Sequence, residues 1–99
     1  MGSKAAVIDI IYRALRNLNE ELSEDKRVAL ATETKLFGPA ASLDSLSLVS
    51  VIVDVESGIA DELGREVSLT DDKAMSQPVS PFSDVNTLAN YIVTQLAKA

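Results

Sequence analysis

The chain has 99 residues, 46% of them hydrophobic and 4% aromatic, so we expect a single domain (1–99) with one modest core of aliphatic side chains. It contains no cysteine and no histidine, which excludes disulfides, thiolate nucleophiles, zinc–thiolate sites and the usual general base at neutral pH. The net charge of −6 and the pI of about 4.4 argue against nucleic acid and anionic membranes as ligands and favour basic partner surfaces.

The first predicted element is an amphipathic helix over about residues 4–18, with Ser3 as a suitable N-cap. Its apolar residues recur at steps of three and four, which is the spacing of one helix face. This face comprises Val7, Ile8, Ile11, Ala14, Leu15 and Leu18.

Residues 19–43 form a long first loop in this prediction. The preferred interpretation is a solvated connector, within which Ser23 is a candidate cap for a short turn that buries Val28 and Leu30. Leu36 and Phe37 are expected to anchor the loop to the core, and the Gly-Pro pair at 38–39 interrupts regular structure.

Residues 45–63 are predicted to form the second helix, which Gly64 ends. The many β-branched residues and their partial alternation also fit a buried strand. A lone strand has no partner for its backbone groups, however, and the segment is too long for an ordinary strand. Ser45 opens this helix behind Asp44, so its hydroxyl is either a plain cap or an attachment point for a phosphate, which a helix N-terminus favours.

Two further helices complete the predicted all-α fold. A short third helix is expected at about 71–75, with Thr70 as its cap and Met75 in the core. The two prolines within 76–83 preclude regular helix there, and Phe82 is expected to plug this segment to the core. Asp84 then caps a last helix over about 85–97. Its apolar face comprises Val85, Leu88, Ala89, Ile92, Val93 and Leu96.

The motif Asp44-Ser45-Leu46, with Val49, Ile52, Val55, Glu56 and Ile59 behind it, resembles the acyl carrier protein family. The chain length, the acidic balance, the preceding helix and the Asn-Tyr-Ile sequence at 90–92 support the resemblance, which covers nearly the whole chain. It implies a four-helix acyl-carrier-like bundle with three longer helices, one short third helix and a long first loop.

The resemblance also implies site residues. Ser45 would carry a 4'-phosphopantetheine arm from coenzyme A, Asp44 would help to bind the modifying enzyme and cap the helix, and Leu46 would pack beneath it. By position, Leu46, Val49 and Val53 correspond to the stripe that partner enzymes meet. The core side of the same helix corresponds to Val51, Ile52, Val55 and Ile59.

Charge placement indicates the same partner-binding helix. No Lys or Arg occurs between Lys35 and Arg65, whereas that interval contains Asp54 and Glu56, both candidate partner-binding residues. The other acids of the interval are Asp44, Asp61 and Glu62. Such an anionic field would steer a basic partner towards the serine.

The chain departs from the family pattern in two respects. Ser47, Ser50 and Ser57 occupy positions where fatty-acid carriers often have acidic residues, and the second helix is longer before Gly64 than the usual version. Both differences favour a specialised carrier over a housekeeping one.

Two functions follow as hypotheses. The first is a non-catalytic carrier that holds an acyl or related group as a thioester. Its expected partners are a phosphopantetheinyl transferase and an acyl-activating ligase, acyltransferase or synthase with a basic docking surface. The second is an acidic helical interaction module in which Ser45 is only a cap. An enzyme is nearly excluded, because Ser45 has no histidine to activate it. No metal site is expected, since the acids lack calcium-loop spacing.

The location is also predicted from what the sequence lacks. No apolar run reaches the ~18 residues that a membrane span needs, and the N-terminus has no signal pattern. We therefore expect a cytoplasmic protein without a membrane span, and a monomer.

Overall fold

The computed structural model describes residues 3–36, 45–64, 66–67, 69 and 83–98. Within them the chain forms α1 (Ser3–Glu21), the 3-10 turn η1 (Glu24–Lys26), α2 (Ser45–Leu63) and α4 (Val85–Lys98). These residues contain no strand, only an isolated antiparallel bridge between Lys35 and Asp84. The all-helical prediction is therefore confirmed for the three long helices. The predictions for Phe37, for the third helix at 71–75 with Thr70 and Met75, and for Phe82 lie outside the described residues.

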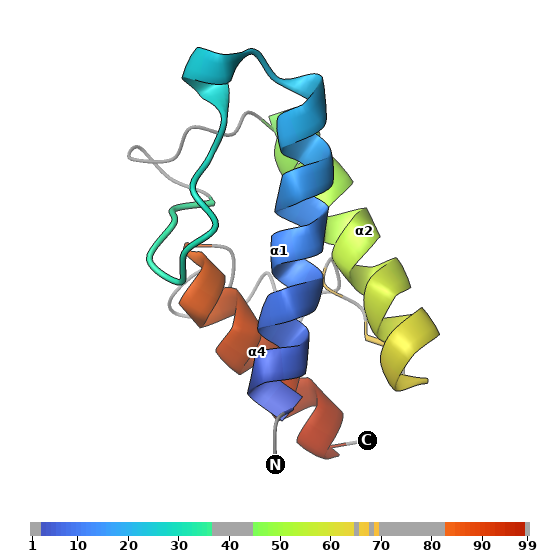
Figure 1. Cartoon of the computed structure of the whole chain (residues 1–99). Helices are drawn as coiled ribbons and strands as arrows, with labels where there is room; N and C mark the ends of the chain where they lie inside the picture. Colours follow the sequence, from blue (N-terminus) through green and yellow to red (C-terminus); the bar gives the residue numbers. More distant parts are fainter. Residues whose placement is uncertain (1–2, 37–44, 65, 68, 70–82, 99) are drawn as a thin grey trace.

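Helix α1 is the centre of the arrangement, because it packs against both α2 and α4 (Figure 1). It runs in the opposite direction to each of them (Figure 1). The bounds agree closely with the predictions for the second and last helices, whereas α1 continues one turn beyond the predicted end at residue 18.

The core between these helices is aliphatic, as the composition predicts. Every buried side chain of the described residues is hydrophobic. The buried residues of α1 are Val7, Ile10, Ile11, Ala14, Leu15 and Leu18, and those of α4 are Val85, Leu88, Ala89, Tyr91 and Ile92. The predicted faces are thus largely correct, although Ile8, Val93 and Leu96 are only partly buried. Ile10 and Tyr91 join the core without having been predicted there.

Ile10 is buried because it meets a glycine of α2. A Cβ added to Gly58 would lie 2.7 Å from Cγ2 of Ile10, which is well inside contact distance. A glycine within a helix costs stability relative to alanine, and here it allows the backbone of α2 to approach α1 closely. This crossing sets the spacing between the two helices.

The first loop is attached to α1 through the side chain of Asn19. The Asn19 amide donates to the Val28 carbonyl and its oxygen accepts from the Val28 backbone N–H, both at 2.9 Å. The Arg27 side chain also donates to the Asn19 carbonyl. The loop is therefore more ordered here than a solvated connector.

The turn prediction within this loop is partly wrong. Ser23 occupies the position before η1 but makes no side-chain cap hydrogen bond. Val28 is half-buried, whereas Leu30 is exposed and does not reach the core. The reason is that the Asn19 contacts hold Val28, whereas no comparable hydrogen bond to another described residue holds Leu30 inward.

The end of the loop is joined to the start of α4, where backbone N–H groups lack helical partners. The Val85 N–H donates to the Thr34 carbonyl at 3.1 Å, and the Leu36 N–H donates to the Ser83 carbonyl at 3.0 Å. Leu36 is fully buried, which confirms its predicted role as the loop anchor.

Asp84 caps α4 as predicted, because its carboxylate accepts a 2.7 Å hydrogen bond from the Thr87 N–H. It also pairs with Lys35 at 3.6 Å. Burial alone would raise the pKa of Asp84, but the hydrogen bonds from Thr87 and the charge of Lys35 outweigh it and hold the pKa below its ordinary value.

Candidate functional site

The candidate site lies on α2, whose bounds coincide with the predicted 45–63. Four of its β-branched residues are buried in the core, and this packing outweighs their lower helix propensity. Gly64 follows with φ of 64°, the left-handed conformation in which glycine ends a helix, and this confirms the predicted stop.

The two sides of α2 are separated as the resemblance implies. On the inner side Val51, Ile52, Val55 and Ile59 are all buried. On the outer side Leu46, Val49 and Val53 are 81%, 54% and 52% exposed. Of the four large hydrophobic side chains exposed among the described residues, these are three, and the fourth is Leu30.

We call Leu46, Val49 and Val53 the outer stripe. Their spacing of three and four residues places them in one row along about two turns of helix. Hydrophobic residues exposed in such a row mark a surface that other molecules cover more often than scattered exposed ones do. The stripe begins directly after Ser45.

Ser45 is the first residue of α2. Backbone N–H groups in the first turn of a helix have no intrahelical acceptor, and the helix dipole favours negative charge there. The position therefore suits a phosphate attached to the serine. The side chain of Ser45 and the whole of Asp44 lie outside the described residues, so their predicted roles remain predictions.

The two acids predicted to bind partners differ in their surroundings. Asp54 is exposed and lines a groove that α2 shares with α1. Glu56 is half-buried, and its carboxylate accepts a 2.7 Å hydrogen bond from the Leu69 N–H. Leu69 is itself fully buried, so Glu56 fastens the segment after α2 to the fold. Its predicted contact with a partner stays a prediction.

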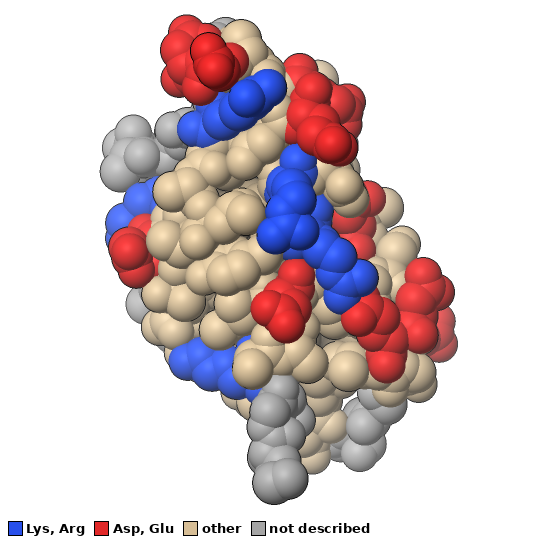
Figure 2. All heavy atoms as spheres, in the orientation of Figure 1, with Lys and Arg blue, Asp and Glu red and all other residues tan. Residues whose placement is uncertain are grey.

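The electrostatic character of the site follows from the sequence of α2, which contains acids but no base. Figure 2 shows Lys and Arg side chains over the middle of α1 and acidic side chains beside them, over the lower half of α2. Arg13 of α1 forms an ion pair with Glu62 of α2 across this border. The negative charge of α2 is therefore greatest beyond the outer stripe, towards its C-terminal half.

Two other classes of site find no support within the described residues. No group of three or more His, Cys, Asp or Glu is placed to hold a metal ion there. None of the described helices combines the length and the hydrophobicity that crossing a membrane requires.

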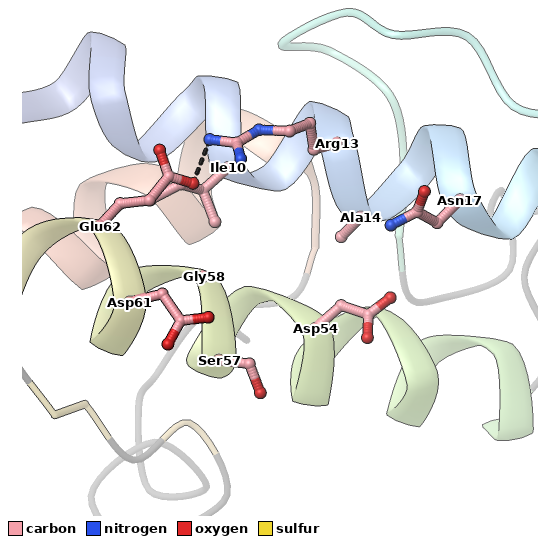
Figure 3. Close-up of a pocket in the computed structure, with 9 residues that line it drawn as sticks. All are labelled: Ile10, Arg13, Ala14, Asn17, Asp54, Ser57, Gly58, Asp61 and Glu62. Atoms are coloured by element: carbon pink, nitrogen blue, oxygen red, sulfur yellow. Dashed lines mark ion pairs between the residues drawn. The ribbon is translucent and has the colours of Figure 1, made fainter.

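Sequence reasoning missed the residues at the border of α1 and α2. Neither Arg13 nor Asn17 was predicted as a site residue, yet both line the groove shared with α2 (Figure 3). The available signal was Gly58, since a glycine inside an otherwise apolar helix indicates a close helix approach.

Comparison of the chain with protein-family models, with curated proteins and with solved structures gives no match.

Proposed function

We propose that the protein is an acyl carrier: a non-catalytic protein that holds an acyl or related group as a thioester on a 4'-phosphopantetheine arm attached to Ser45. The observation that carries the proposal is the outer stripe, because α2 begins at Ser45 and exposes Leu46, Val49 and Val53 immediately after it. The proposed fold is the four-helix carrier bundle, with a short third helix at 71–75 added to the three described helices.

The residues of this chain would have simple roles. The Ser45 hydroxyl gives up its proton to the transferase and its oxygen bonds to the pantetheine-bound phosphorus of coenzyme A, while the P–O–P bond breaks and adenosine 3',5'-bisphosphate leaves. The first turn of α2 offers backbone N–H groups to the phosphate that stays on the serine. Asp44 assists the modifying enzyme, and Leu46 packs against it. The arm supplies the reactive thiol, which is compatible with a chain that has no cysteine.

The proposed partners dock on the outer stripe and on the acids beside it. They are a phosphopantetheinyl transferase, which installs the arm, and an acyl-activating ligase, acyltransferase or synthase with a basic docking surface. Asp54 and Glu56 are the proposed contacts for basic side chains. Ser47, Ser50 and Ser57 reduce the negative charge near Ser45, which favours the enzymes of a specialised pathway. The carrier is proposed to act as a cytoplasmic monomer.

The test is modification of the purified chain. The protein is incubated with coenzyme A and a broad-specificity phosphopantetheinyl transferase, and its intact mass is measured. We expect a gain of one phosphopantetheine, absent in Ser45→Ala. Ser50→Ala is the matched control, because Ser50 is exposed on the same helix, and it should be modified like the wild type. No gain with several such transferases would contradict the proposal.

The second candidate function is an interaction module without a prosthetic group. The outer stripe favours it equally, because exposed apolar side chains bind a partner whether or not Ser45 is modified. The same mass measurement separates the two functions, since the module would remain unmodified with every transferase.

A further inference from the structure

A short segment runs back along α2 after the helix ends. We call its described residues the strap: Gly64, Glu66, Val67 and Leu69. Gly64, with φ of 64°, turns the chain at the end of α2. The Leu69 N–H then lies 2.7 Å from the carboxylate of Glu56, a residue about 12 Å back from Gly64 along the helix axis. Because the five residues from Gly64 to Leu69 span at most about 17 Å, the strap reaches Glu56 with little slack.

The strap lies on the flank of α2 that faces away from α1. Asp54 and Glu56 are two positions apart, so they project about 200° apart around the helix. Asp54 lines the groove with α1 (Figure 3), and Glu56 and Leu69 therefore lie on the opposite flank. Val53 of the outer stripe is three positions before Glu56 and is its neighbour on the helix surface. Glu56 thus stands between the outer stripe and the strap.

The strap is held by few contacts with the described helices. Leu69 is fully buried in the core, and Val67 is half-buried against it. Gly64 and Glu66 are exposed. Among the described residues, the bond from the Leu69 N–H to Glu56 is the only hydrogen bond that joins the strap to the side chain of a helix. The helices, by contrast, pack on one another through α1. A segment with one buried anchor and one such bond has low local stability.

The hydrogen bond is needed because the Leu69 N–H is buried together with its residue. A buried N–H without an acceptor is costly, so without the Glu56 oxygen this N–H must reach water. Leu69 reaches water most easily by leaving the core, since Gly64 and Glu66 of the strap are already exposed. Any oxygen acceptor in the place of the carboxylate would meet this need, although a charged acceptor makes the stronger bond.

We infer that the strap is a conformational device that opens from α2 while the three long helices stay packed, and that Glu56 is its latch. In the closed form Glu56 holds Leu69 in the core. In the open form Leu69 meets water, and both carboxylate oxygens of Glu56 are free for another molecule. Glu56 is thus a positioning residue that acts as a hydrogen-bond acceptor. The device is independent of Ser45 and of the proposed function, because both forms belong to the unmodified chain.

Native-state hydrogen exchange tests whether the strap opens separately. Exchange of the 15N-labelled full-length chain is followed by NMR at several urea concentrations below the unfolding transition. The Leu15 amide, in the middle of α1, reports global unfolding, which exposes much surface and is therefore promoted by urea. After correction for intrinsic rates, we expect the Leu69 amide to exchange at least about tenfold faster than the Leu15 amide and to depend little on urea. Equal rates with equal urea dependence would overturn the separate opening.

Three variants test the latch. Glu56→Ala removes the acceptor and should accelerate exchange at the Leu69 amide about 10- to 100-fold, because a hydrogen bond to a charged group is lost. Glu56→Gln retains an acceptor oxygen and should keep the acceleration below about tenfold. Asp54→Ala is the matched control, because it removes an exposed carboxylate from the opposite flank of α2. It should leave the exchange rate within about twofold of the wild type.

Two outcomes would overturn the role of Glu56. Equal acceleration in Glu56→Gln and Glu56→Ala would show that the charge, and not the acceptor, holds Leu69. Acceleration in Asp54→Ala as large as in Glu56→Ala would show that the loss of any acid from α2 has the same effect. If Glu56→Ala does not fold, Glu56→Gln still decides, because acceleration beyond about tenfold in that variant contradicts the latch.

Discussion

The contact between Gly58 and Ile10 gives a prediction whose sign opposes helix propensity. Alanine is favoured over glycine inside a helix by up to about 1 kcal/mol, so an unconstrained Gly58→Ala would stabilise α2. The added Cβ would lie 2.7 Å from Cγ2 of Ile10, about 1 Å closer than an optimal carbon–carbon contact. The β-branched Ile10 side chain is restricted to one preferred rotamer in a helix, so it cannot easily move away.

The free energy needed to relieve this overlap should exceed the gain in helix propensity from glycine to alanine. Overpacking a close-packed core costs about 1–3 kcal/mol. We therefore expect Gly58→Ala to lower the free energy of unfolding by about 1 kcal/mol, which is a Tm about 4–8 °C lower for a chain of this size. Urea unfolding followed by circular dichroism measures the free energy, and a thermal scan measures the Tm.

A double-mutant cycle isolates the cause. Ile10→Leu removes the Cγ2 methyl group at nearly constant volume, so in that background Gly58→Ala should stabilise the protein by about 0.5–1 kcal/mol. The coupling energy should then be about 1–3 kcal/mol. Ser57→Ala is the control, since Ser57 is exposed, and it should show no coupling to Ile10. Stabilisation by Gly58→Ala in both backgrounds would refute the close approach of the two helices.

Three other predictions concern the cap of α4, the loop and the outer stripe. Asp84→Ala should cost about 1 kcal/mol at pH 7 through loss of the cap. Because the pKa of Asp84 is lowered in the folded state, its ionic contribution is present above the pKa of the unfolded chain and is lost as the pH falls through the folded pKa. The difference between wild type and Asp84→Asn in urea unfolding should therefore shrink on acidification, and a constant difference would contradict this. Asn19→Ala should lower the free energy of unfolding by about 1–2 kcal/mol, because two hydrogen bonds to Val28 are lost. Hydrogen exchange at the Val28 amide should accelerate, and unchanged protection of that amide would contradict the role of these two bonds. Leu46→Ser should change the free energy of unfolding by less than about 0.5 kcal/mol, because Leu46 is exposed, and yet it should slow the modification of Ser45. An unchanged rate of modification would show that the modifying enzyme does not dock on the outer stripe.

Hydrophobic periodicity predicted the three long helices well, because each one buries a regular face against another. In α2, Val55 and Ile59 were predicted to face the core and Leu46 to face partners, and the first two are buried whereas the third is exposed. That separation required the family resemblance, since the helix is apolar on several sides and periodicity alone does not say which side faces the core.

Contacts between segments distant in the chain were not predictable from the sequence. The hydrogen bonds between the Asn19 side chain and the Val28 backbone join residues that are nine apart in the chain. From the sequence, an asparagine at a helix end usually indicates only a cap or a turn. The joining of Leu36 to the segment before α4 depends on how the loop folds back over the bundle. The groove could likewise not be predicted, because it depends on how α1 and α2 cross and so bring Asn17 and Asp54 to the same groove.

Locating the modification on the chain tests the carrier proposal most directly. The protein is treated with coenzyme A and a phosphopantetheinyl transferase, and tandem mass spectrometry of its peptides assigns the added group to a residue. The proposal predicts one phosphopantetheine on Ser45 and none on Ser47 or Ser50. An unmodified Ser45, or the group on another serine, would contradict it.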